Sequence, residues 1–202
     1  MKLDCLSKRS NFIGTVNAML QEFHFASPEV LIRLVNVYAS SFYGSNLWDL
    51  YSPQVDKIYK SWNVTVRNIF NLPWKTHRYW IEIISNCLHP KTFLTSRLVK
   101  FARSLMSSRK IGVRFLASLC VDDHRTVMGK TLSKIADEMS TPVESLTPTS
   151  IKSSLKYVQC PADEVWRIPL LQELLDMKKN KGKIENMLMD DVDNMVNFLC
   201  TD

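Results

Sequence analysis

Proline directly after serine or threonine recurs along this chain, and this pairing limits the possible folds more than any other feature. Ser27-Pro28, Ser52-Pro53 and Thr147-Pro148 each place a helix-capping residue before proline, which fits the first turn of a helix but not its interior. Long stretches favour helix-forming residues, and no stretch alternates apolar and polar residues as a strand does. We therefore expect an all-α fold, an irregular array of several helices.

The apolar pattern predicts three parts. Residues 1–44 form a hairpin of two helices, the first capped by Ser10 and the second beginning at Pro28, buried on most sides and ending at Gly44. Residues 45–121 form a basic helical core. Residues 122–202 form a looser helical tail.

Within the core, one helix is predicted from Pro53 to about Asn71, with its apolar residues on one face. Further helices are expected to begin at Thr76 and Thr92, and Gly112 separates the last of them from a short apolar segment. In the tail, we expect a helix over 126–139, a capping box over 141–144, a leucine-rich segment over 170–175 and an acidic helix that opens at position 190.

Positive charge is concentrated in the middle of the chain. Residues 57–134 carry 15 basic and 3 acidic side chains, although the net charge of the whole chain is +6. Such segregation indicates an anionic partner. The alternative is a helical surface that is basic but simply solvated.

Aromatic residues are interleaved with these cations. Cations neutralise phosphates, and exposed aromatic rings stack on nucleic-acid bases. We expect Trp62 to belong to the core, because it falls on an apolar helix face. Trp74 stands between Pro73 and Lys75 in a predicted loop, and it is the better candidate for an exposed ring.

No catalytic or metal-binding constellation is visible. Gly129-Lys130-Thr131 lacks the preceding glycine and strand of a phosphate loop, and Asp122-Asp123-His124 has no second ligand cluster to complete a site. The five cysteines are scattered and odd in number, which indicates reduced thiols in an intracellular protein, nuclear or cytoplasmic. We expect no cofactor, no metal, no small-molecule ligand and no membrane partner.

Five short motifs follow one another in a fixed order, and together they resemble a known family. They are Ser10-Asn11-Phe12-Ile13-Gly14-x-Val16-Asn17, Tyr43-Gly44-x-x-Leu47-Trp48, Trp62-Asn63-x-x-x-Arg67, Leu72-Pro73-x-x-Thr76-His77 and Arg97-x-x-x-Phe101. The series resembles the carboxy-terminal part of LINE-type (non-long-terminal-repeat) retrotransposon polyproteins, just after the reverse-transcriptase palm.

The resemblance implies a role for each part. The hairpin would be the thumb, which grips the template–primer duplex, and the basic helices would hold element RNA or target DNA. The palm of this family carries its catalytic aspartates in a Tyr/Phe-x-Asp-Asp turn, which this sequence lacks. We therefore expect the palm to precede Met1 and to be a partner of this chain, and we do not expect the chain itself to be an RNA-directed DNA polymerase.

We predict that ten side chains contact nucleic acid: Lys57, Lys60, Arg67, Lys75, His77, Arg78, Arg97, Lys100, Arg103 and Lys110. The motif residues interpreted as structural are Tyr43, Gly44, Leu47, Trp48, Leu72, Pro73 and Thr76. Two alternatives to nucleic-acid binding stay open. The chain is a helical module that packs its apolar stripes against a partner protein, or it is a decayed retroelement fragment without a present function.

Overall fold

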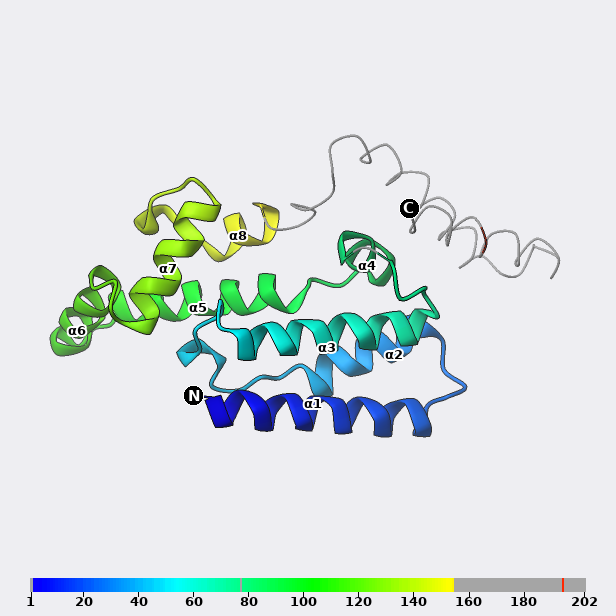
Figure 1. Ribbon diagram of the computed structural model, residues 1–202. Coiled ribbons are helices and arrows are strands. Elements are labelled where there is room, and N and C mark those ends of the chain that lie inside the picture. Colours follow the sequence, from blue (N-terminus) through cyan, green and yellow to red (C-terminus); the bar gives the residue numbers. More distant parts are fainter. Residues whose placement is uncertain (1, 77, 155–193, 195–202) are drawn as a thin grey trace.

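The computed structural model describes residues 2–76, 78–154 and 194 of the 202-residue chain (Figure 1). Every regular element in these ranges is a helix, so the predicted all-α class is confirmed. The leucine-rich segment over 170–175 and the acidic helix expected from position 190 fall outside the described residues.

Helix α1 (Lys2–Glu22) lies beside α3 (Pro53–Phe70), and α2 (Pro28–Leu34) packs against both (Figure 1). The prediction that the first helix begins at Ser10 was wrong, because α1 starts two turns earlier. Cys5 is buried together with Phe12 and Val16. Cys5 thus extends the buried side of α1 by almost two turns toward the amino end. Because cysteine is a small apolar residue, this extension is hard to see in the sequence.

The second predicted helix ends early, in a π-turn. Helix α2 continues into η1 (Val35–Ala39), where the amide of Ser40 donates to the carbonyl oxygen of Val35 at 3.0 Å. Val37 and Tyr38 are 67% and 66% exposed, so the expectation of a helix buried on most sides was wrong. The wide turn directs Val35 and Ala39 into the core and leaves Val37 and Tyr38 outside.

Helix α3 confirms the helix that was predicted from Pro53. Its apolar face is fully buried at Val55, Ile58, Trp62 and Val66. Asn71 ends the helix in a left-handed conformation with φ of 50°, and its amide bonds back to the last turn. An asparagine tolerates this conformation better than most side chains, so the helix stops where the sequence turns toward Pro73.

Three helices follow, and two of their predicted limits need correction. They are α4 (Arg78–Ser85), α5 (Pro90–Met106) and α6 (Ile111–Asp122). Helix α5 is capped by His89, whose Nδ1 accepts a hydrogen bond from the amide of Lys91 at 3.1 Å, and not by Thr92. Gly112 lies inside α6 and does not separate two elements, because α5 has already ended.

The last described elements pack around α5. Helix α7 (Val127–Glu138) begins where predicted, with Thr126 as its cap, and η3 (Val143–Ser145) is a short 3-10 turn where a capping box was expected. Helix α8 (Pro148–Ser154) lies along α5, which also contacts α3, α6 and α7 (Figure 1). Most buried apolar residues from Cys5 to Ile151 belong to one hydrophobic cluster, and the predicted three-part division stays a prediction.

Candidate nucleic-acid interface

Helix α5 carries three of the predicted cations on its outer side. Arg97, Lys100 and Arg103 are exposed, and their spacing of three residues places them in an oblique row that turns by about 120° around the helix. Leu94 and Leu98 lie on the buried side of the same helix. The row is therefore a consequence of the amphipathic pattern that packs α5 into the core.

Both arginines of this row are anchored to other segments. Arg97 Nη1 donates to the carbonyl oxygen of Ser41 at 2.6 Å, and Arg103 Nη1 donates to the carbonyl oxygen of Leu146 at 2.9 Å. These acceptors are neutral, so the two bonds orient each guanidinium without cancelling its charge. Each guanidinium has five N–H donors, and the remaining ones can meet an anion.

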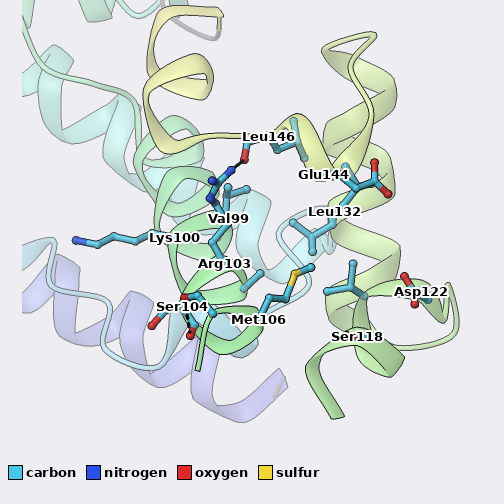
Figure 2. Close-up of a pocket in the computed structure, with 14 residues that line it drawn as sticks. Val99, Lys100, Arg103, Ser104, Met106, Ser118, Asp122, Leu132, Glu144 and Leu146 are labelled. Atoms are coloured by element: carbon cyan, nitrogen blue, oxygen red, sulfur yellow. Dashed lines mark hydrogen bonds between the residues drawn. The ribbon is translucent and has the colours of Figure 1, made fainter. Parts of the chain in front are cut away.

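A cavity of about 710 Å³ opens beside the row, between α5, α6, α7 and the turn that includes η3 (Figure 2). Figure 2 shows Lys100 extending away from this cavity and Arg103 turned toward Leu146. Asp122 and Glu144 lie on the opposite wall. Because this wall is acidic, a phosphate chain is better accommodated on the outer side of α5 than inside the cavity.

The cations of α3 differ in how they are engaged. Lys57 and Lys60 are both exposed, and Lys60 Nζ lies 2.8 Å from the Asp56 carboxylate in a solvent-accessible ion pair. Such a surface pair contributes little to stability. It nevertheless partly offsets the charge of Lys60, so Lys57 is the better placed of the two for an anionic ligand.

Arg67 is bonded to the turn that follows α3, unlike the exposed lysines of the same helix. Its side chain is half-buried, and Nη2 donates to the carbonyl oxygen of Thr76 at 2.6 Å, across the turn between α3 and α4. Burial lowers the pKa of Arg67, but a guanidinium stays protonated at neutral pH. Arg67 therefore bridges α3 and this turn, and its contact with a phosphate stays a prediction.

The other predicted cations lie on several elements. Lys75 is exposed in the turn between α3 and α4, Arg78 is half-buried at the start of α4, and Lys110 is exposed at the cap of α6. His77 lies outside the described residues. The turn and the start of α6 are at opposite ends of the molecule in Figure 1, so the nine predicted residues that the structure describes are spread over several elements.

The motif residues divide into buried and exposed ones. Trp48 and Thr76 are buried, and Gly44 adopts a left-handed conformation with φ of 83° before η2 (Ser45–Leu47). Tyr43 and Leu47 are largely exposed, so their side chains do not hold the core together. Leu72 and Pro73 are half-buried in the turn that follows α3.

The exposed apolar face of α6 was not predicted from the sequence. Helix α6 exposes four large apolar side chains, which are Ile111, Phe115, Leu116 and Leu119. Apolar residues surround most of this short helix, so its sequence pattern did not distinguish the packed side from the open side. Only Ala117 of α6 is fully buried.

Comparison with protein-family models, with curated proteins and with solved structures finds no match for this chain. In the described ranges, no helix combines the length and the apolar character needed to cross a membrane. The same ranges contain no group of three or more His, Cys, Asp or Glu side chains arranged to hold a metal ion.

Proposed function

We propose that this chain is a non-catalytic nucleic-acid-binding module, and that the outer side of α5 contacts the phosphate backbone. The observation that carries this proposal is the anchoring of Arg97 and Arg103 to carbonyl oxygens on either side of Lys100. Anchored cations lose less side-chain freedom when they bind a phosphate than free ones do.

The dimensions of the row suit a nucleic-acid strand. From Arg97 to Arg103 the helix rises by about 9 Å, at 1.5 Å per residue. This length corresponds to roughly two to three nucleotides of a duplex, at a rise of about 3.4 Å along each strand. The row can therefore neutralise two or three neighbouring phosphates.

We infer the class of nucleic acid from the sequence motifs. Their resemblance to LINE-type reverse transcriptases favours template–primer duplex, element RNA or target DNA as the ligand, and a reverse-transcriptase palm as the protein partner. The exposed cations of α5 are compatible with each of these ligands, because phosphate contacts carry no sequence information.

The proposal is tested by titrating a labelled duplex DNA and a structured RNA with the protein at several salt concentrations. Lys100→Glu is compared with Arg33→Glu, which makes the same change in net charge at an exposed position of α2. We expect Lys100→Glu to weaken binding and to reduce the slope of log K against log salt by about one. Equal effects of the two substitutions, or the absence of binding by the unaltered protein, would contradict the proposal.

The exposed apolar face of α6 favours a second candidate function, a helical module that binds another protein. Contiguous exposed apolar residues of this kind commonly mark interaction surfaces. The two functions are separated by the same titration, since in a protein-binding module Lys100→Glu and Arg33→Glu weaken any electrostatic binding to nucleic acid equally. In that case Phe115→Glu, and not Lys100→Glu, is the informative substitution.

A further inference from the structure

Trp74 differs from the other tryptophans that the structure describes. Its side chain is 80% exposed, whereas Trp48, Trp62 and Trp80 are at most 2% exposed. Exposure of a large aromatic ring leaves apolar surface in water. This ring therefore contributes little to the core and is accessible to a ligand.

The turn that presents this ring is held from both sides. On one side, the amide of Leu72 donates to the carbonyl oxygen of Arg67 at 2.9 Å. On the other side, the amide of Thr76 donates to the carbonyl oxygen of Pro73 at 3.1 Å. The carbonyl oxygen of Thr76 accepts a hydrogen bond from Nη2 of Arg67 at 2.6 Å. Because its neighbours are bonded to α3 or to one another, the ring is displayed by an ordered turn.

A cation accompanies the ring. Lys75 Nζ lies over the ring of Trp74, 5.6 Å from its centroid. This ammonium covers one face of the indole and leaves the other face for a flat ligand.

We propose that Trp74 is a stacking platform for one unpaired base, and that Lys75 neutralises the phosphate beside that base. This inference rests on the proposed nucleic-acid binding, and it adds a preference for single strands or unpaired ends. A base within a duplex is already stacked on its neighbours, whereas an unpaired base offers its face to an aromatic side chain. The platform is separate from the row on α5.

The test uses the full chain with a labelled single-stranded oligonucleotide of about 12 nucleotides and a hairpin duplex of similar length. Trp74→Ala is expected to weaken single-strand binding by about tenfold and to change duplex binding little. Trp74→Phe keeps an aromatic face and is expected to retain most of the affinity. Since the side chain is exposed, both variants should fold, which circular dichroism checks.

The outcomes distinguish this inference from the proposed function. If Trp74→Ala binds the single strand as the unaltered protein does, while Lys100→Glu weakens binding, the stacking platform is refuted and the α5 row stands. If the unaltered protein binds neither oligonucleotide, both proposals fail together.

Discussion

Trp48 Nε1 donates a hydrogen bond to Asp4 Oδ2 at 2.7 Å, and this bond joins the first turn of α1 to the loop that precedes α3. Trp48 is 2% exposed, so its N–H has been removed from water. The carboxylate supplies the partner that a buried indole N–H requires. Trp48 also meets the ring of Phe42, at 6.2 Å between centroids, which ties the same loop to the core.

Asp4→Leu is expected to lower the free energy of unfolding by about 1–3 kcal/mol, because the buried indole N–H loses its acceptor. Asp4→Asn keeps an oxygen at this position and should cost less. Urea denaturation measures both. Asp56→Ala is a suitable control, since it removes a carboxylate from an exposed ion pair and should have an effect below about 1 kcal/mol. Equal costs for Asp4→Leu and Asp56→Ala would show that the indole bond contributes nothing specific.

Gly129→Ala is expected to destabilise the fold by about 1–3 kcal/mol. A β-carbon at this position would lie 2.9 Å from the carbonyl oxygens of Cys120 and Val121, and closer still to that of Asp123. Helices α6 and α7 would have to move apart. Gly14→Ala is the matched control, because Gly14 has open space around it in the middle of α1, and the substitution should stabilise the protein by about 0.5–1 kcal/mol. Chemical denaturation of both variants checks the opposite signs.

His89 should make the protein less stable in acid. Its ring is buried between Tyr59 and Trp62, and burial together with Arg78 and Lys91 lowers its pKa from 6.5 to about 3. Between these values the unfolded chain binds a proton that the folded chain does not. The free energy of unfolding is therefore highest, as far as His89 is concerned, above about pH 6.5. It falls by about 1.4 kcal/mol per pH unit as the pH is lowered from there toward 3.

We expect His89→Gln to show a smaller loss of stability between pH 7 and pH 5 than the unaltered protein, by about 2 kcal/mol. The measurement is urea denaturation at both pH values. Other groups titrate in this interval, so the comparison uses the difference between variants. His24→Gln makes the same substitution at an exposed position and serves as the control. If His89→Gln does not alter the pH dependence of the free energy of unfolding, the folded protein can bind a proton at His89 without loss of stability.

Arg67 and Lys57 should behave in opposite ways. Arg67→Gln is expected to lower the free energy of unfolding by about 1.5–3 kcal/mol, because it removes a charged donor from the Thr76 carbonyl. It should not change the salt slope of nucleic-acid binding measured where the variant is folded. Lys57→Gln should leave the stability within about 0.5 kcal/mol. If Arg67→Gln is stable but loses about one unit of salt slope, the guanidinium contacts phosphate after all.

Local signals in the sequence were sufficient for several elements. Ser52-Pro53 begins α3 as expected, and Thr126 caps α7 by accepting from the amide of Gly129. Each signal depends only on a few neighbouring residues, so it can be interpreted without knowledge of the fold. The start of α1 was missed because Lys2–Arg9 has no proline, and its buried cysteine is a weak apolar marker.

The roles of the arginines could not be predicted in this way. The carbonyl oxygens that anchor Arg97 and Arg103 belong to Ser41 and Leu146, which are 56 and 43 residues away in sequence. A helical pattern indicates which side of a helix is polar, but it does not indicate which loop lies beside that side. The same limit applies to α6, whose open apolar face depends on where its neighbours end.

The π-turn Val35–Ala39 has a consequence for the path of the chain. A turn closed by an i to i+5 bond holds about one residue more than an α-helical turn, so the chain leaves it rotated by roughly 100°. Removing a single residue here would restore regular winding and send the segment leading to Gly44 toward a different side of α1. The loop that seats Phe42 and Trp48 thus depends on the length of the chain at this point, a property that no single side-chain substitution tests.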